Sequence, residues 1–391
     1  MNATSQQVVD PDKAPPPVLG FFVSEFSVRN RGAALANVHS VTNSEGFVPS
    51  TDYFKKEVFS KDLSTYKIVR RGMLAYNPSR INVGSVAVQN RAEEVVVSPL
   101  YVVVSVDGTR LHPDYLSAFL HSPGALAQIR ALTSGSVRDT LSFRSFAKLR
   151  LPVPPLEEQE AALHRLAGVR RLRDLREQQL LCLDNLAKSL FVEMFGDMDT
   201  NPKGWRKVPL REHAKVIVGF PFSSSGFSET GNKIVGGYVL MQGFILWNEC
   251  KYWPSSSSHQ KYLLQDGDIV MAMDRPWVGN GFKIAQVDSS HLPALLIQRT
   301  ACIRSRSMEK SFLFAMLNSR WFADHCNIKG SLVPHISNRD IDSFEVFEPP
   351  EELQHLFSER VKFLDKSKFA IRKSLDELNR LYRSLLQQYF G

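Results

Sequence analysis

The sequence lacks most features of secreted and membrane proteins. It has four cysteines in 391 residues, Cys182, Cys250, Cys302 and Cys326, and none forms a CxxC pair. Isolated thiols of this kind are typical of reduced intracellular proteins, not of a disulfide framework or a zinc cluster. Residues 1–17 hold no apolar core for a signal peptide, and no later run approaches the ~20 apolar residues of a membrane span. We therefore expect a cytoplasmic protein without membrane contact.

Motifs for catalysis are missing as well. No GxxxxGK[ST] loop is present, so ATP hydrolysis is not expected. Residues 76–79, Tyr-Asn-Pro-Ser, share part of the Asn-Pro-Pro-Tyr motif of amino-methyltransferases but lack its second proline and its aromatic residue. No glycine-rich cofactor loop follows a predicted strand. We interpret residues 76–79 as a turn.

Two other groups of reactive side chains are better explained by structure. Asp266 and Asp268 flank Gly267 at a predicted turn, without the further acid and lysine that a nuclease requires. His325 and Cys326, even with Cys302, lack a fourth well-spaced metal ligand. We predict no catalytic residue, no metal site and no cofactor bound by this chain.

The composition bounds the fold and the partners. Apolar residues make up 43% and charged residues 23%, which is ordinary for a globular protein. A length of 391 residues predicts about two to three domains. The formal net charge of +8 mildly favours an anionic partner. We expect residues 1–17, which are polar and rich in proline, to be a flexible lead-in.

A long stretch without proline follows a short proline-rich strap. Pro152, Pro154 and Pro155 exclude a helix where they stand, and the next proline is Pro202. The Leu-, Glu-, Gln- and Arg-rich residues from Glu157 predict a helix of roughly 40 residues, about 60 Å long. That is longer than ordinary globular helices and is typical of a coiled coil.

The same strap and helix return at the end of the chain, about 195 positions later. Both copies begin with PP-x-E-x-Q and end with Phe-Gly in one register. The matches are Pro154–Pro155 with Pro349–Pro350, Glu157 with Glu352, Gln159 with Gln354, Arg165 with Arg360, Leu180 with Leu375, Leu183 with Leu378, Leu186 with Leu381, Ser189–Leu190 with Ser384–Leu385, and Phe195–Gly196 with Phe390–Gly391. Shared leucine spacing arises by chance, but these shared ends do not. We infer an internal duplication.

The duplication extends into the mixed segments before each helix. Landmarks keep the offset: Gly72, Arg80, Gly84, Ser142 and Arg144 match Gly267, Arg275, Gly279, Ser337 and Arg339. In the first copy, the apolar β-rich runs 95–97 and 101–106 predict strands, and residues 114–132 predict two helices broken at 122–124. Residues 66–88 predict three strands with a turn and a loop between them. Other parts of the two segments differ widely.

The two long helices differ in their seam, the line of apolar residues at heptad spacing along one face of each helix. The second helix shows heptad spacing, interrupted only by Lys368, at Phe357, Val361, Leu364, Ile371, Leu375, Leu378, Tyr382, Leu385 and Tyr389. In the first, Leu166 and Val169 give way to Arg173 and Arg176, with Leu172 and Leu175 beside them. The seam resumes at Leu180, Leu183, Leu190 and Met194, which predicts a local stutter or a polar layer. We expect an antiparallel pair with a pseudo-two-fold axis; the alternative is that each helix packs on its own domain.

This layout resembles the specificity (S) subunit of type I restriction–modification enzymes. The residues that carry the resemblance are LPVPPLEEQ at 151–159, SLFVEMFGD at 189–197, VFEPPEELQ at 346–354 and GSVRDTLSFRSFAKL at 135–149. The resemblance covers the chain from about residue 18. The second strap departs from the usual pattern at Glu348 and Glu351, where small or apolar residues are commoner.

The resemblance implies an α+β fold with two target-recognition domains, 18–153 and 198–347. The helical spacers would be 154–197 and 348–391, forming an antiparallel coiled coil. Each domain would read one half of a bipartite site in double-stranded DNA, and the helices would set the spacing. Two methyltransferase (M) subunits would dock on the helices, and restriction (R) subunits would join the complex. S-adenosylmethionine, ATP and Mg would be bound by those partners, while this chain performs no chemistry.

Candidate DNA contacts come from residues repeated in both domains. Arg80 and Arg275 lie in glycine-rich loops, where a guanidinium can bind phosphate or guanine; the alternative is a salt bridge that holds the loop. Lys283 is a weaker candidate. A second cluster is rich in short polar side chains suited to phosphate, or else to capping: Ser134, Gly135, Ser136, Arg138 and Arg144 in the first copy, and Gly330, Ser331, His335, Asn338 and Arg339 in the second.

Other interpretations remain open at the level of sequence. Arg170, Arg171, Arg173 and Arg176 are expected on a solvated or subunit-docking face, with tracking of the DNA backbone as the alternative. For the whole chain, the rivals to DNA recognition are a self-contained DNA methyltransferase or nuclease and a coiled-coil assembly protein without DNA specificity.

Overall fold

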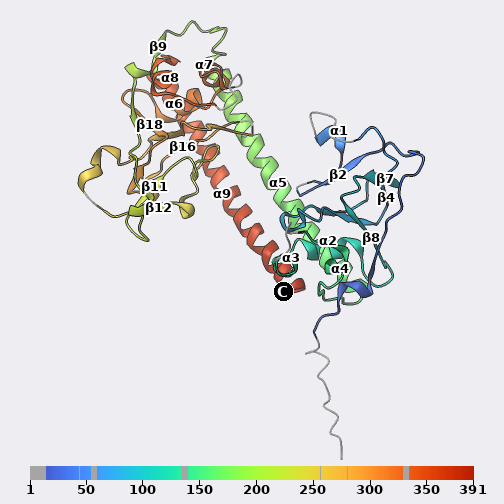
Figure 1. Cartoon of the computed structure of the whole chain (residues 1–391). Coiled ribbons are helices and arrows are strands. Elements are labelled where there is room, and N and C mark those ends of the chain that lie inside the picture. The colour runs from blue at the N-terminus through green and yellow to red at the C-terminus, as the bar shows by residue number, and fades with distance from the viewer. Residues whose placement is uncertain are drawn as a thin grey trace, which may run out of the picture. The chain divides into compact units, whose positions relative to one another are not determined.

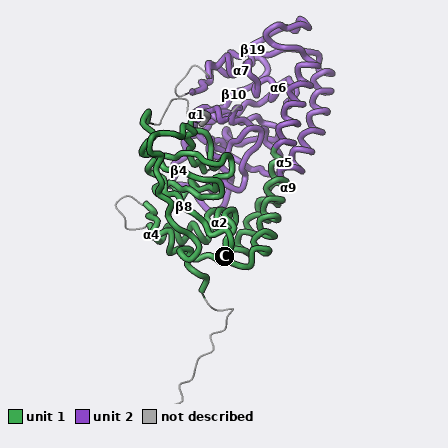
Figure 2. The backbone as a smooth tube through the Cα atoms, turned by 90° about the vertical axis from the view of Figure 1, so that its right-hand side faces the viewer, with its two compact units in different colours: residues 1–177, 373–391 green, residues 178–372 purple. Residues whose placement is uncertain are grey.

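The computed structural model describes residues 15–43, 45–53, 60–133, 140–255, 257–279, 281–328 and 334–391. It is a mixed α+β structure that divides into two compact units. Unit 1 comprises residues 1–177 and 373–391, and unit 2 comprises residues 178–372 (Figure 2). The predicted lead-in, residues 1–17, falls mostly outside the described residues.

Two helices of 40 residues each, α5 (Leu156–Phe195) and α9 (Glu351–Phe390), confirm the predicted long helices (Figure 1). The other helices are short: α1 (Ser50–Tyr53), α2 (Pro113–Leu120), α3 (Pro123–Thr133), α4 (Phe143–Phe146), α6 (Lys310–Leu317), α7 (Arg320–His325) and α8 (Asn338–Ser343). The pair α2 and α3 confirms the helices predicted around residues 122–124.

Most strands are three to six residues long. Those of unit 1 are β1 (Val23–Glu25), β2 (His39–Thr42), β3 (Gly46–Pro49), β4 (Lys67–Arg70), β5 (Leu74–Tyr76), β6 (Val86–Val88), β7 (Glu94–Val97) and β8 (Val102–Val106). Those of unit 2 are β9 (Lys207–Pro209), β10 (Ala214–Val218), β11 (Asn232–Val235), β12 (Lys251–Trp253), β13 (Ile269–Ala272), β14 (Trp277–Val278), β15 (Gly281–Phe282), β16 (Ile284–Gln286), β17 (Ala294–Leu296), β18 (Thr300–Ser305) and β19 (Glu345–Phe347).

The central sheet of each unit has four strands in the same order. In unit 1 the order is β1-β8-β5-β6, and in unit 2 it is β10-β18-β13-β16, with every pairing antiparallel. Side chains alternate between the faces of a strand. Leu74 and Tyr76 therefore enter the core that includes α2, while Ala75 enters the core shared with β4 and β7. Because both faces are covered, the sheet is a rigid centre for the unit.

The small sheets that cover the outer face differ between the units. Unit 1 uses two antiparallel pairs, β2–β3 and β4–β7. Unit 2 uses a three-stranded sheet, β12-β11-β17, in which β11 and β17 run parallel. Its additional pair, β14–β15, packs in the core that includes α6 and α7. The shared frame is therefore the central sheet with the helices that follow it, and the differences lie in the covering sheets.

Each strap is fixed by a buried glutamine, which explains the repeated PP-x-E-x-Q pattern. The carboxamide of Gln159 is fully buried, accepts from the amide of His112 (2.8 Å) and donates to the carbonyls of Arg110 (3.0 Å) and Pro154 (2.7 Å). Gln354 repeats this role, accepting from the Glu309 amide (3.1 Å) and donating to the Pro349 carbonyl (2.9 Å). The glutamine satisfies backbone groups that would otherwise be buried without a partner.

Each long helix contributes to the cores of both units. Ala162 and Leu166 of α5 belong to the main core of unit 1, while Phe191 and Phe195 belong to that of unit 2. In α9 the order is reversed: Phe357 lies in the core of unit 2, and Leu386 and Phe390 lie in that of unit 1. The alternative in which each helix packs only on its own domain therefore does not describe these cores.

Burial along α5 follows unbroken steps of three and four residues through the arginine-rich middle. The buried and half-buried positions on this stripe are Ala162, Leu166, Val169, Arg173, Arg176, Leu180, Leu183, Ala187, Leu190 and Met194. Leu172 and Leu175 point away from it and are 50% and 47% exposed. Of the two predicted interpretations, the polar layer is correct and the stutter is wrong, because arginine occupies the seam without a change of register.

Within each unit, α5 and α9 make their contacts in opposite order. As the residue number increases along α5, the number of its contact partner on α9 decreases. In unit 1 Arg165 Nη1 donates to the Tyr389 hydroxyl (3.1 Å), and Arg170 Nε donates to that of Tyr382 (2.8 Å). In unit 2 Lys368 Nζ pairs with Asp184 (2.7 Å), and Arg360 Nη1 lies 3.9 Å from Met194 Sδ. Arg165–Tyr389 and Arg360–Met194 are the same pair of positions in the two copies.

The seam residues predicted on α9 are half-buried or buried, from Phe357 through Val361, Leu364, Ile371, Leu375, Leu378, Tyr382 and Leu385 to Tyr389. Lys368 also lies on this stripe, with its side chain only 12% exposed and paired with Asp184 and Asp365. The interruption predicted at Lys368 is thus a second polar position, held by two carboxylates.

Candidate nucleic-acid interface

In each unit, the arginine that both copies share lies in the turn after the third strand of the central sheet, which is β5 in unit 1 and β13 in unit 2. In unit 1, β5 ends at Tyr76, and Arg80 precedes the short 3₁₀ helix η3 (Ile81–Val83). In unit 2, β13 ends at Ala272, and Arg275 follows three residues later. Both turns are tied to the segment before α4 or α8, because the Leu141 amide donates to the Pro78 carbonyl (3.0 Å). At the matching positions of unit 2, the Ile336 amide donates to the Met273 carbonyl (2.8 Å).

The guanidinium groups of the two arginines form no ion pair with an acid that the structure describes. Arg80 and Arg275 are both exposed, and within the described residues neither side chain makes a hydrogen bond or ion pair. The salt bridge considered as an alternative is thus not found among these residues. Arg275 has a positive φ of 46°, a conformation that is uncommon for a residue with a Cβ. Its amide donates to the Pro334 carbonyl (3.2 Å), which holds the strained turn.

The Asp274 carboxylate beside Arg275 binds two other basic side chains. It accepts a hydrogen bond from His335 Nδ1 at 2.5 Å and forms an ion pair with Arg299 Nη1 at 3.2 Å, and a backbone bridge also joins Asp274 to His335. The structure therefore brings two predicted residues, Arg275 and His335, to one turn. We call Asp274, Arg299 and His335 the Asp274 clip. Unit 1 has Ser79 and Thr140 at the positions of Asp274 and His335, so its turn has no such ion pair.

The second predicted cluster is only partly described. Ser134, Gly135, Ser136, Arg138, Gly330 and Ser331 lie outside the described residues. Arg144 on α4 and Asn338 and Arg339 on α8 are exposed. The neighbouring serines cap these helices: Ser142 Oγ accepts from the Ser145 amide, and Ser337 forms a capping box with Asp340. Capping therefore accounts for the two serines and leaves the exposed arginines for other roles.

Lys283 is less available than the arginines. Its ammonium group donates to the Gly237 carbonyl at 3.2 Å, and the residue is half-buried. Its backbone amide also donates to Pro276 (2.7 Å). This lysine stabilises the turn that carries Arg275, so a contact of its ammonium group with DNA stays a prediction.

The arginines in the middle of α5 match the expected solvated face only in part. Arg170 and Arg171 are exposed, while Arg173 and Arg176 are half-buried in the seam. Arg170 donates to the Tyr382 hydroxyl and lies over its ring at 5.3 Å, and Arg173 lies 5.9 Å from the same ring. Cation–π contact with Tyr382 helps to accommodate Arg173 in the seam. Docking of a subunit on this face stays a prediction.

Several chemically suggestive residues have structural roles. Tyr76 is fully buried, donates its hydroxyl to the Leu141 carbonyl (3.2 Å) and stacks on Phe146, so residues 76–79 form the predicted turn. Burial raises the pKa of the Tyr76 hydroxyl well above its usual range. Asp268 is 3% exposed and makes a bidentate pair with Arg304 (2.8 and 2.7 Å). The predicted turn at Gly267 is confirmed, with a positive φ like that of Gly72.

Three of the cysteines, Cys250, Cys302 and Cys326, show no sign of activation. Burial raises the pKa of Cys326 to about 12 and that of Cys250 to about 11, and it raises that of Cys302 further still. Among the described residues, no three His, Cys, Asp or Glu side chains are grouped as metal ligands. The absence of a metal site in the whole chain stays a prediction.

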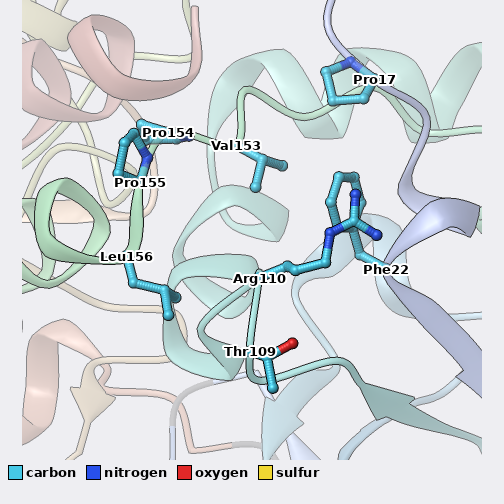
Figure 3. A pocket seen from close by; sticks show the side chains of 8 residues that line it. All are labelled: Pro17, Phe22, Thr109, Arg110, Val153, Pro154, Pro155 and Leu156. Carbon is cyan, nitrogen blue, oxygen red and sulfur yellow. The ribbon is translucent and has the colours of Figure 1, made fainter.

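The straps differ in what lies against them. Beside the first strap is a groove of about 380 Å³, lined among others by Phe22, Val153 and Pro154, with the Arg110 guanidinium 4.5 Å from the Phe22 ring (Figure 3). In the second strap, Glu348 pairs with Arg206 (3.3 Å) and His213 (3.1 Å). The unusual glutamate at 348 is therefore accommodated by two basic partners.

None of the helices in the described part of the chain combines the length and apolarity needed to cross a membrane.

Comparison with known proteins indicates the family. No family model matches the chain. The type I restriction enzyme MjaVIII specificity subunit of Methanocaldococcus jannaschii is 25% identical over 276 residues, which are 66% of this chain and 65% of that protein. The EcoAI specificity subunit of Escherichia coli is 28% identical over 181 residues, 44% of this chain and 31% of the relative. The curated relatives of this chain are type I specificity subunits.

The matched part spans less than two thirds of either of these specificity subunits. Solved structures of such subunits share the fold over nearly the whole chain. The S subunit from M. genitalium has a TM-score of 0.55 at 12% identity and covers 98% of both chains. A chain from a structure of type I restriction–modification complex assembly has a TM-score of 0.53 at 18% identity, covering 96% of this chain and 98% of its own. The predicted resemblance is confirmed.

Proposed function

We propose that this chain is the non-catalytic, sequence-specific DNA-recognition subunit of a type I restriction–modification complex. One target-recognition domain, predicted at 18–153, would read one half of a bipartite site, and the other, at 198–347, would read the second half. The observation that supports this is the contrast within the duplication: the central sheets have one strand order, while the covering sheets and the arginine-bearing turns differ. A shared frame with two different reading edges suits two different half-sites.

The long helices would form an antiparallel coiled coil with a pseudo-two-fold axis. The opposed contact order of Arg165–Tyr389 and Arg170–Tyr382, and its repeat at Arg360–Met194, support this arrangement. A helix of 40 residues is about 60 Å long, and one turn of B-DNA is ~34 Å. The pair is therefore long enough to set a fixed gap between the half-sites.

The chemistry would belong to partner subunits. Two M subunits would dock on the helical spacers 154–197 and 348–391 and carry S-adenosylmethionine, and R subunits would supply ATP- and Mg-dependent cleavage. Support for a non-catalytic chain comes from Tyr76 and Asp268, the residues closest to a catalytic motif, because both are buried in structural contacts. Location in the cytoplasm is part of the same proposal.

Methylation mapping tests the proposal directly. Genome-wide detection of N6-methyladenine should reveal a split motif with a fixed gap that vanishes when this chain is deleted. The purified chain with DNA and S-adenosylmethionine should transfer no methyl group until M subunits are added. Methylation by the chain alone would instead establish a self-contained methyltransferase.

The remaining rival is an assembly protein without DNA specificity. Phosphate contacts release counterions, so DNA affinity of the complex should fall steeply as salt rises. Binding that is absent or insensitive to salt, with M subunits present, would favour the assembly protein.

A further inference from the structure

A small pocket in unit 1 lies beside Arg80. It measures about 70 Å³ and is lined by the end of β2, by the turn between β5 and η3, and by Tyr101. Of the described residues that line it, Arg80 is the only charged one. The others that matter for binding are Asn43, Asn77 and Tyr101, none of which was predicted from the sequence as a DNA contact.

Most acceptor groups around this pocket already have donors. Thr42 Oγ1 accepts from the Glu45 amide (3.0 Å), Asn77 Oδ1 accepts from the Ser79 amide (3.0 Å), and the Tyr101 hydroxyl oxygen accepts from the Val41 amide (3.3 Å). The side-chain hydroxyl of Ser85 is also committed, since it donates to the Val41 carbonyl (2.7 Å). These bonds fix the walls and leave few acceptors for a ligand.

The groups that stay unbonded within the described residues are mainly donors. They are the Arg80 guanidinium, the Asn77 amide nitrogen, the Tyr101 hydroxyl hydrogen and the Asn43 carboxamide, which alone also offers an acceptor. A guanidinium presents a planar fork of N–H groups that matches two neighbouring acceptors. With no acid in the described lining, the pocket favours a ligand edge made of acceptors.

We propose that this pocket binds a pair of acceptor atoms on the DNA half-site read by unit 1, with Arg80 as the fork and Asn77 and Tyr101 as further donors. In DNA this chemistry belongs to the O6 and N7 edge of guanine in the major groove or to two oxygens of one phosphate. Adenine fits less well, because its N6 is a donor and needs an acceptor. The inference rests on the proposed function.

Unit 2 reads its half-site through a different arrangement. There the matching turn is held by the Asp274 clip, whose carboxylate pairs with Arg299 and accepts a hydrogen bond from His335 beside Arg275. The pocket of donors is thus a property of unit 1, and its loss should affect one half-site.

The test uses the complex co-purified with this chain and the split site found by methylation mapping. Arg80→Lys keeps the charge and removes the fork, Arg80→Ala removes both, and Tyr101→Phe removes one donor. Arg91→Ala is the matched control, because Arg91 is an exposed arginine of unit 1 away from the pocket lining. Thermal melting of each variant shows whether the fold is intact.

Two modified duplexes distinguish the sources of the acceptors. If guanine is bound, Arg80→Ala and Arg80→Lys should cut discrimination at one guanine of one half-site by about 5- to 150-fold. The loss caused by either variant should be smaller when 7-deazaguanine, which lacks the N7 acceptor but keeps O6, replaces that base. If phosphate is bound, the loss for Arg80→Ala should be uniform across sequences, and its salt slope should fall by about one. Arg80→Lys should keep the salt slope, and one methylphosphonate should reproduce the effect of Arg80→Ala.

The inference is overturned if both Arg80 variants match Arg91→Ala in affinity, discrimination and salt slope while the wild-type complex still recognises its site. Failure of the wild-type complex to recognise any split site would instead contradict the proposed function.

Discussion

The two units share one structural frame but differ in the turns and small sheets attached to it. Both place a four-stranded sheet against two helices and bury a strap glutamine, Gln159 or Gln354, in the same way. They diverge at the turn after β5 or β13. Unit 1 leaves Arg80 beside an open polar pocket, whereas unit 2 places Arg275 beside the Asp274 clip. The comparison teaches that the repeated glutamines support the helices, while the repeated arginines at the candidate reading edges have different surroundings in the two units.

The largest expected losses of stability come from removing one buried aromatic ring from the core of each unit in turn. The ring of Phe195 packs edge-to-face against that of Phe312 with 4.7 Å between centroids in unit 2, and the ring centroid of Phe390 lies 4.9 Å from that of Tyr115 in unit 1. Replacing either with alanine should destabilise its unit by about 3–5 kcal/mol, because a large buried ring is lost. Hydrogen exchange should show the loss of protection in unit 2 for Phe195→Ala and in unit 1 for Phe390→Ala. The reverse assignment would contradict the core memberships.

A buried ion pair in unit 2 and an exposed one in unit 1 should respond differently. Asp268→Asn leaves Arg304 without its partner in a site where the carboxylate is 3% exposed, so we expect a loss of about 3 kcal/mol. Glu93→Gln breaks the Arg71 pair, whose glutamate is 85% exposed, and should change stability little. Urea unfolding followed by intrinsic fluorescence measures both. Equal losses would show that burial does not distinguish these pairs.

A mutation in one unit should also affect recognition of one half-site and leave recognition of the other unchanged. Arg275→Ala should reduce recognition of one half-site only, by about 1–3 kcal/mol if it contacts a base edge. The half-site weakened by Arg80→Ala should be the other one. Competition binding with duplexes mutated in each half measures the effect. Weakening of both half-sites by Arg275→Ala would contradict the modular proposal.

The Asp274 clip should act on selectivity more than on affinity. Asp274→Asn releases His335 and Arg299 as uncompensated donors beside Arg275, so binding to unrelated DNA should strengthen while discrimination falls several-fold at the half-site of unit 2. Ser79→Ala, at the matching position of unit 1, is the control and should leave discrimination unchanged. Measuring affinity for specific and random duplexes at one salt concentration checks this.

The smallest effect concerns the seam of α5. Leu172→Gln should change stability by no more than about 0.5 kcal/mol, because the side chain is half-exposed and lies off the stripe. Leu166→Ala, at a position 3% exposed, should cost about 2–5 kcal/mol. Thermal denaturation of both variants compares them. A large loss of stability for Leu172→Gln would support the stutter in place of the polar layer.

Local patterns were enough to predict the long helices, the strap and the turns at Gly72 and Gly267. The periodicity of α5 misled at Leu172 and Leu175, because a leucine beside a seam resembles a leucine within it. Arginine is uncommon at such positions, and the contact of Arg173 there is with the ring of Tyr382, more than 200 residues away in the sequence.

The sequence predicted residues of the candidate DNA interface only where the same residue type recurs in both copies of the duplication. Arg80 and Arg275 stand out because they match across the duplication. Asn43 and Tyr101 have no such signal, since their place beside Arg80 depends on how β2 and the β7–β8 turn fold back on the central sheet. The contact of Asp274 with His335 likewise joins residues 61 positions apart. Pairings of that range are set by tertiary structure, not by spacing.

The place of Phe390 in the core of unit 1 has a consequence for synthesis of the chain. Residues 373–391 complete that unit, yet they are synthesised only after the whole of unit 2. At about 5–20 residues per second, the 214 residues between Glu177 and Gly391 take on the order of ten to forty seconds to make. During that time Tyr115 and Phe119 lack their aromatic partner. Most of unit 1 is thus synthesised first, yet its core is completed only when Phe390 has been made.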